Sequence, residues 1–252
     1  MKNILFVMPS LGSGGAEKSL VNLLNLIDYE KYAVDLLLFK REGLFLSQIP
    51  KKVRLLQPTD SLQYAYKIDR GMFSSVSGIK AGILRGTSTF VCKLLYKGNA
   101  RQQRWIKFYK RYLPNLEEEY DVAIGYLENN PIYYCVDNVD ANKKIGFIHN
   151  DYDKLGLNPI GDRFYFNKLD NIVTVSEECA EVLKNRFPEY RDKVRVMHNI
   201  VSPSVINEMA KEKIEMNNAE INLATVGRLN YQKGYDMAIE ACKKLVEKGY
   251  DI

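Results

Sequence analysis

A glycine-rich turn near the start of the chain carries backbone that suits an anionic ligand. Gly12, Gly14 and Gly15 lie within residues 8–18, between a short apolar run and a run with helical apolar spacing. Glycine allows positive φ and lets a ligand approach without a Cβ in the way. A helix that begins behind the glycines adds free N–H groups and the positive end of its dipole. A plain turn between a strand and a helix is the alternative, because the spacing is not that of a dinucleotide-binding motif.

A second glycine-bounded turn, residues 227–234, adds two positive charges. Arg228 and Lys233 lie five positions apart within it, although in most proteins such residues are ordinary surface charges. An arginine can make a forked pair of hydrogen bonds to phosphate oxygens, and a lysine supplies a compact point charge. The two turns together favour a ligand that contains phosphate.

Further polar candidates follow apolar runs that are expected to be strands. These runs are residues 4–7, 32–39, 53–56, 120–126, 144–148, 171–175 and 193–197. Their alternation with helical segments predicts an α/β fold, a doubly wound parallel Rossmann-like sheet of about six or seven strands. His149, Ser176 and Asn199 follow the last three runs, and ligands bind at this edge of such a sheet. A strand at 221–226 and a helix behind it are expected to begin a second Rossmann-like unit.

Each polar candidate also has an ordinary structural role open to it. His149 can be a satisfied histidine at a strand end, and Ser176 is placed to cap the following helix. Glu128 follows the run at 120–126, where a helix cap is a simpler interpretation than a ligand-binding carboxylate. His198 is expected to be structural.

The composition bounds the class of protein. The 252 residues are 46% hydrophobic and 27% charged, which suits one large domain or two modest ones with a real core. Four well-separated cysteines form no C-x-x-C motif and are expected to be reduced thiols of a cytosolic protein. There is no signal-peptide pattern, and no apolar run approaches the roughly 18 residues of a spanning helix. We therefore expect a soluble or peripheral protein that needs neither a metal nor a cofactor.

One segment of the chain is strongly basic. Residues 67–111 contain eleven basic residues and one acidic residue, Asp69, so the segment has a net charge of +10 and the remainder −5. Apolar residues at helical spacing predict helices from about 75 to 113, with a break at Gly98 and Asn99. Two surface helices with a solvated basic face are one interpretation. The other is an amphipathic patch at Lys80–Arg111 that lies on an anionic membrane. Nucleic acid is not expected, because no nucleic-acid-binding module is recognisable.

Five motifs, taken in order, resemble those of the family 4 glycosyltransferases. They are Gly14-Gly15-Ala16-Glu17, His149-Asn150-Asp151, Val175-Ser176-Glu177, His198-Asn199 and Val226-Gly227-Arg228-Leu229-x-x-Gln232-Lys233-Gly234. The last motif is quite specific and the first is weak by itself, but together they span nearly the whole chain. Enzymes of this family are retaining and metal-independent, with two facing Rossmann-like domains in the GT-B architecture.

The resemblance implies a role for each matched position. Gly14 and Gly15 would lie against the donor diphosphate and the acceptor. His149 would be the catalytic-site histidine near the donor sugar, and Arg228 and Lys233 would grip the diphosphate of the sugar nucleotide. Three further positions are expected to line the cleft: Glu17, Ser176 and Asn199.

These roles imply that a sugar passes from a UDP- or GDP-sugar to a polysaccharide, wall-polymer or lipid-linked acceptor, with retention. The resemblance favours an enzyme of capsular or other cell-surface polysaccharide synthesis, cytoplasmic and peripheral at the inner face of the membrane. The residue types agree with this chemistry, because the leaving diphosphate gains negative charge that fixed cations and N–H groups can stabilise without a metal. No D-x-D metal motif stands at a convincing strand end.

The expected organisation is an acceptor-side domain at 1–200, a linker at 201–219 and the start of a donor-binding domain at 220–252. The E-x7-E motif of the family has no match, so we expect a fragment of a longer protein or a short relative. One strand and one helix cannot bury a Rossmann core. Apolar side chains of 220–252 should then stay exposed unless another chain covers them, which suggests a dimer.

Two other functions stay open. A non-catalytic module that holds a glycan or a lipid headgroup, or that pairs with a partner glycosyltransferase, needs no complete donor site. A dinucleotide-dependent enzyme is the second. The irregular glycine spacing and the lack of a clear ribose-binding acid after the second strand speak against it.

Overall fold

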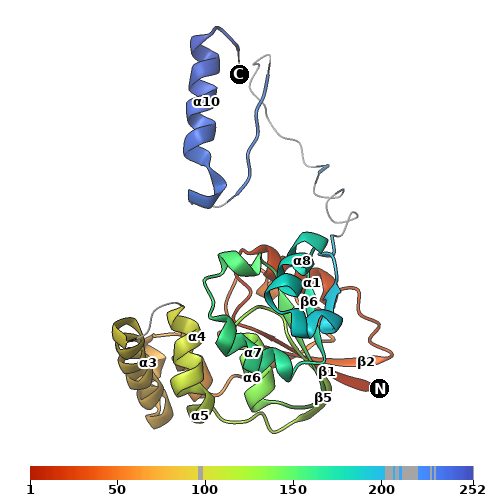
Figure 1. The fold of residues 1–252 in the computed structure, drawn as a ribbon, viewed down its shortest axis with the longest axis vertical. Helices are drawn as coiled ribbons and strands as arrows, with labels where there is room; N and C mark the ends of the chain where they lie inside the picture. Colours follow the sequence, from red (N-terminus) through yellow and green to blue (C-terminus); the bar gives the residue numbers. More distant parts are fainter. Residues whose placement is uncertain are drawn as a thin grey trace. The chain divides into compact units, whose positions relative to one another are not determined.

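The computed structural model describes residues 1–252 except 96–98, 202–206, 208–209, 212–220, 228, 230 and 252. The chain divides into two units, Met1–Val201 and Ser202–Ile252 (Figure 1). Most of the expected linker at 201–219 lies outside the described residues, as does Arg228. Each unit is taken by itself below.

A seven-stranded parallel sheet forms the centre of the first unit, as the alternating pattern predicts. Its strands lie in the order β3-β2-β1-β4-β5-β6-β7. They are β1 (Lys2–Met8), β2 (Tyr32–Leu38), β3 (Arg54–Leu56), β4 (Glu119–Gly125), β5 (Asp140–Ile148), β6 (Asn171–Thr174) and β7 (Val194–Val196). The order reverses between β1 and β4, which makes the sheet doubly wound. In such sheets ligands bind beyond the carboxyl ends of the strands at this reversal.

Helices cover the sheet. They are α1 (Gly15–Leu24), α2 (Asp60–Tyr66), α3 (Val76–Leu95), α4 (Ala100–Arg104), α5 (Lys110–Tyr112), α6 (Asn130–Asn138), α7 (Pro159–Asn167) and α8 (Glu177–Arg186). Shorter turns are η1 (Leu46–Gln48), η2 (Arg70–Ser74), the π-helical η3 (Trp105–Tyr109), η4 (Tyr152–Lys154) and η5 (Pro188–Lys193). The sequence analysis missed α7, although Asn158 caps it and Pro159 begins it. No helix in the described ranges is long and apolar enough to cross a membrane.

Side chains of β1 alternate between two apolar cores. Leu5 and Val7 pack in one core with side chains of α6, α7 and α8, whereas Phe6 and Met8 pack in the other with those of α1. Successive strand residues point to opposite faces of a sheet. The sheet is therefore apolar on both faces, which explains why the sequence of β1 reads as a continuous apolar run.

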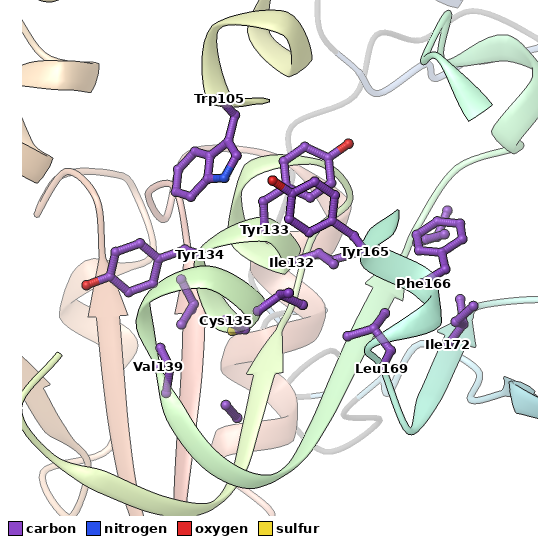
Figure 2. Close-up of a cluster of buried hydrophobic side chains, with 14 of the residues drawn as sticks. Trp105, Ile132, Tyr133, Tyr134, Cys135, Val139, Tyr165, Phe166, Leu169 and Ile172 are labelled. Carbon is purple, nitrogen blue, oxygen red and sulfur yellow. The ribbon is translucent and has the colours of Figure 1, made fainter. Parts of the chain in front are cut away.

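An aromatic cluster fixes the basic segment to this sheet. Figure 2 shows Trp105 of η3 beside Tyr133 and above Tyr134 of α6, with the ring of Tyr165 of α7 against that of Tyr133. The ring centroids of Trp105 and Tyr133 are 6.2 Å apart, and those of Tyr133 and Tyr165 are 4.0 Å apart. Trp105 is fully buried and its indole N–H donates to Asp137 Oδ2 at 3.0 Å. The second half of the basic segment is thus anchored by a large buried contact.

The second unit has less regular structure than expected. α10 (Tyr235–Glu247) follows the turn η6 (Tyr231–Lys233), but residues 221–226 form no strand. The backbone N–H of Ile221 donates to Asp251 O at 3.0 Å. Leu223 and Val226 are exposed as expected, Val226 to 97%. The dimer that this exposure suggests stays a prediction.

Candidate functional site

The expected site residues of the first unit follow the carboxyl ends of the strands. The glycine loop follows β1, His149 follows β5, Ser176 lies two residues beyond β6 and Asn199 lies three beyond β7. The carboxyl ends of parallel strands meet at one edge of a sheet, so these positions belong to the same edge.

His149 has a neutral ring whose two nitrogens lack hydrogen-bond partners of normal geometry. The ring lies against Tyr126 and Phe147, with centroid distances of 5.0 and 5.8 Å. Both nitrogens are buried and neither makes a hydrogen bond of normal geometry. Burial lowers the pKa of His149 to about 4, and a polar contact with the Tyr126 backbone, which lacks normal hydrogen-bond geometry, raises it by less. A buried polar group without a partner is uncommon, and it marks this ring as a ligand-binding candidate.

Tyr126 connects His149 to the helix that follows the glycine loop. Its hydroxyl lies 3.0 Å from Ser19 Oγ of α1 in a buried hydrogen bond. Its ring stacks on Phe147 at a centroid distance of 4.5 Å. Burial raises the pKa of Tyr126, so its hydroxyl stays protonated. This role could not be predicted from the sequence, because an aromatic residue at the end of a strand is typical of the core.

Glu128 fixes the backbone at the end of β5. Its Oε2 accepts from the His149 N–H at 3.0 Å and its Oε1 accepts from the Asn150 side-chain amide at 2.7 Å. The expectation that Glu128 caps a helix is wrong, because the N-cap of α6 is Asn129, which makes no side-chain cap hydrogen bond. Asn129 has a φ of 72°, and no other described residue except glycine has a positive φ. Such backbone costs about 1–3 kcal/mol and is found most often at functional sites.

The glycine loop leaves backbone open at the start of α1. A side-chain carbon placed on Gly15 would meet nothing within 4 Å. The same carbon on Gly14 would come 2.0 Å from Glu17 Oε2, because the Glu17 carboxylate folds back over the loop. Glu17 therefore occupies the helix N-terminus that an anionic ligand would use. None of Gly12, Gly14 and Gly15 adopts the positive φ that glycine allows, so these glycines provide room rather than unusual backbone conformation.

A different glycine, Gly43, holds the loop in place. It has a φ of 134°, and a side-chain carbon there would come 1.9 Å from Leu11 O. On either side of it, the Leu11 N–H donates to Glu42 O at 3.0 Å and the Phe45 N–H donates to Leu11 O at 3.1 Å. The loop after β1 is thus tied to the loop after β2. Gly43 was not among the expected site residues, since one glycine in a polar turn does not reveal a contact with a distant segment.

Ser176 after β6 and Asn199 after β7 differ in whether their side chains already make a hydrogen bond within the described part of the chain. Ser176 Oγ accepts from the Cys179 N–H at 3.3 Å and caps α8, as expected. Asn199 is exposed at the edge of the sheet. His198 Nδ1 lies 3.2 Å from Val175 O, which fits its expected structural role. The chain beyond is held by the Asn22 amide, which donates to Ile200 O at 2.8 Å.

Lys233 belongs to the second unit. It ends the turn η6, and Gly234, with a φ of 63°, separates it from α10. Lys233 therefore lies in the turn and not in the helix. A side-chain carbon placed on Gly227 would lie 3.5 Å from Lys233 Cδ, so the lysine stem runs along this glycine. The assignment of Lys233 and Arg228 to a diphosphate stays a prediction.

A cavity of about 750 Å³ lies at the amino edge of the sheet, away from these residues. Its buried carboxylate is already satisfied: Arg54 donates to Asp35 at 2.8 and 2.5 Å, and the Tyr120 hydroxyl donates to Asp35 at 2.6 Å. A carboxylate with three donors needs no ligand, so we place the candidate site at the carboxyl edge. In the part of the chain that the structure describes, no group of three or more His, Cys, Asp or Glu is arranged to hold a metal ion.

No protein-family model matches the chain, and no curated protein matches it. Two solved structures are similar to it, both of Anabaena Alr3699/HepE. The complex with UDP-glucose has 13% sequence identity and a TM-score of 0.42, over 84% of this chain and 49% of that one. The complex with UDP and glucose has 14% identity and a TM-score of 0.40, over 84% and 50%. The chain thus spans about half the length of the solved structures that it matches. Similarity at this level carries no inference about activity.

Proposed function

We propose that this chain is part of an enzyme that transfers a sugar from a UDP- or GDP-sugar to a glycan or lipid-linked acceptor. The observation that carries the proposal is the neutral ring of His149, with both nitrogens unpaired, at the same sheet edge as the open backbone of Gly15. Membership of family 4, retention, independence from a metal and a role in cell-surface polysaccharide synthesis are proposed on the sequence resemblance alone.

A neutral imidazole suits the sugar side of this reaction. The bond between the anomeric carbon and the diphosphate breaks, the carbon bonds to an acceptor oxygen, and the acceptor proton passes to the leaving diphosphate. Positive charge develops on the sugar as the first bond breaks. An imidazolium about 4 Å away would oppose a full charge by about 4 kcal/mol at intermediate screening. A His149 ring whose pKa is about 4 avoids this repulsion at pH 7 and still hydrogen-bonds a sugar hydroxyl.

The His149 ring must turn to meet a sugar, because its nitrogens are covered in this structure. Each buried polar atom without a partner costs about 1–3 kcal/mol. Rotation away from Tyr126 and Phe147 toward a sugar hydroxyl recovers part of that cost. We propose that the ring makes this turn on donor binding, while Glu128 keeps the His149 backbone in place.

The proposal is tested in the complete enzyme of which this chain is proposed to be part, by incubating it with UDP- and GDP-sugars and measuring release of the nucleoside diphosphate. His149→Ala should lower turnover by about 10- to 100-fold, which is the worth of one or two hydrogen bonds, at an unchanged melting temperature. His198→Ala is the matched control and should keep its activity. A large loss of stability with residual activity intact would assign His149 a structural role. Glycan binding with no turnover of any sugar nucleotide would favour the non-catalytic module.

A further inference from the structure

Helix α3 carries its small side chains inside and its large ones outside. The fully buried residues of the helix are Gly78, Ala81, Ser88 and Cys92. The opposite side presents Val76, Ile79, Ile83, Phe90 and Leu94, with exposures between 38% and 70%. A surface helix of a soluble protein has the reverse arrangement, with its apolar stripe on the core.

Tight packing prevents α3 from turning its large side chains inward. A side-chain carbon on Gly78 would come 2.5 Å from Met72 O, and one on Gly82 would come 2.2 Å from Met72 Sδ. Beside Met72, the inner side therefore admits only small residues. Figure 1 shows α3 beyond α4 and away from the sheet, at the periphery of the first unit. The large apolar side chains are fixed in an outward orientation.

Basic residues border this apolar stripe. At 100° per residue, Lys80 and Lys93 fall on opposite sides of the line through Ile83 and Phe90, and both lysines are exposed. They belong to the segment 67–111, which holds eleven basic residues and one acidic residue. The same surface is thus apolar along its centre and positive at its borders.

We propose that the outer face of α3 docks on an anionic lipid membrane, with Ile83, Phe90 and Leu94 at the boundary of the acyl chains and Lys80 and Lys93 among the headgroups. Apolar area and positive charge are the two contributions that hold an interfacial helix on such a surface. Charge complementarity decides for anionic lipid over a second copy of the chain, because two copies would bring two strongly positive segments together. This inference is independent of the proposed sugar transfer.

The test is co-sedimentation of the chain with vesicles of phosphatidylcholine alone and of equal parts phosphatidylcholine and phosphatidylglycerol, at low and high salt. We expect binding to the anionic vesicles that weakens with salt, and little binding to the neutral ones. The triple variant Ile83→Ser, Phe90→Ser, Leu94→Ser should bind at least about tenfold more weakly, because it removes three apolar side chains. Lys80→Gln and Lys93→Gln should each weaken binding by a factor of about five, which is what about 1 kcal/mol per lysine amounts to.

The matched control is Leu26→Ser, Leu44→Ser, Ile160→Ser, which changes three exposed apolar residues outside α3 and should bind like the unchanged chain. Fluorescence of Trp105, the single tryptophan, reports whether each variant is folded. In Phe90→Trp, brominated lipid should quench the indole placed on α3 and leave buried Trp105 unaffected. Equal binding to both kinds of vesicle, an unaffected α3 triple variant, or a dimer that this variant dissociates without vesicle binding would each overturn the inference.

Discussion

The carboxylate of Glu128 accepts a hydrogen bond from the backbone N–H of His149 at 3.0 Å, so a side chain three residues beyond β4 sets the position of the residue after β5. The second carboxylate oxygen holds the Asn150 side chain at 2.7 Å. β4 and β5 are neighbours in the sheet, and the contact extends their pairing beyond the last ladder hydrogen bond. One acidic side chain thereby orders the turn that carries the candidate catalytic histidine.

Glu128→Ala should lower the free energy of unfolding by about 1–3 kcal/mol, because it leaves the donors of His149 and Asn150 without their charged acceptor. Urea denaturation measures the change. Glu117→Ala is the control, since Glu117 is an exposed glutamate just before β4, at the other end of the same strand. If the two variants unfold at the same urea concentration, the contacts of Glu128 with His149 and Asn150 contribute nothing to the order of this turn.

The His149 ring should titrate near pH 4 in the folded chain. The chain has two histidines, so NMR of the imidazole protons in His198→Ala assigns the signal without ambiguity. An unperturbed histidine titrates near 6.5. A His149 signal that titrates near 6.5 would show that its ring is hydrated, and the argument from unpaired nitrogens would fail.

The same burial predicts how stability depends on pH. As pH falls below about 6.5 the unfolded chain protonates His149, while the folded chain resists protonation until about 4. Stability from this residue is therefore full above pH 6.5 and decreases toward pH 4, by up to about 3 kcal/mol. Burial raises the pKa of Asp162 to about 6, so that carboxyl acts in the opposite direction over part of this range. Comparison with His149→Phe isolates the histidine: the variant should lose less stability between pH 7 and pH 5.

The spacing of apolar residues predicted the sheet well, because each strand or helix can be recognised from a short stretch of sequence. Each strand of the first unit contains apolar residues in a short run. The alternation of such runs with helical segments is enough to predict a parallel sheet. The expected strand at 221–226 did not form, since a strand exists only when a neighbour pairs with it and the apolar pattern cannot show one. The cap by Ser176 was found because a cap joins residues three positions apart.

The parts of the site that sequence reasoning missed are long-range contacts. Glu128 and His149 are 21 positions apart, and Gly43 acts through a backbone carbonyl of Leu11. Neither Glu128 nor Gly43 stands in a motif, so no residue spacing in the sequence could indicate either contact. The inverted packing of α3 was hidden for a similar reason: its apolar and basic residues were visible in the sequence, but which side faces the protein depends on Met72 and its neighbours.

Gly43→Ala should unfold the chain far more easily than Gly15→Ala. A methyl group on Gly43 meets Leu11 O at 1.9 Å and also has to adopt a φ of 134°, whereas one on Gly15 meets nothing within 4 Å. Backbone strain of this kind costs about 1–3 kcal/mol before the collision is counted. Thermal unfolding of both variants checks the difference. Equal melting temperatures would mean that the loops after β1 and β2 separate without cost.

Arg228→Ala and Lys233→Ala should each weaken binding of UDP or GDP by about 1.5–3 kcal/mol, the usual worth of a charge-assisted hydrogen bond. Isothermal titration calorimetry gives the affinities. Lys243→Ala is the matched control, because Lys243 is an exposed lysine of α10. Its Nζ lies 3.8 Å from Glu247 Oε1 in an ion pair on the same helix. If neither variant changes the affinity, the diphosphate does not bind at this turn, and the non-catalytic module becomes the better interpretation.

Glu17→Gln should strengthen the binding of a nucleoside diphosphate. The Glu17 carboxylate folds over Gly14 at the N-terminus of α1, where it has the same sign of charge as the ligand that the loop is proposed to receive. Two unit charges about 4 Å apart in water oppose each other by about 1 kcal/mol, so affinity for UDP or GDP should rise about fivefold. Glu117→Gln removes one negative charge elsewhere and controls for the net charge of the chain; it should leave the affinity unchanged. The amide keeps the size of the side chain, so the comparison reports charge alone. If Glu17→Gln instead weakens binding, the carboxylate accepts hydrogen bonds from hydroxyl groups of the ligand. The open backbone at Gly15 would then receive the sugar or the acceptor rather than the diphosphate.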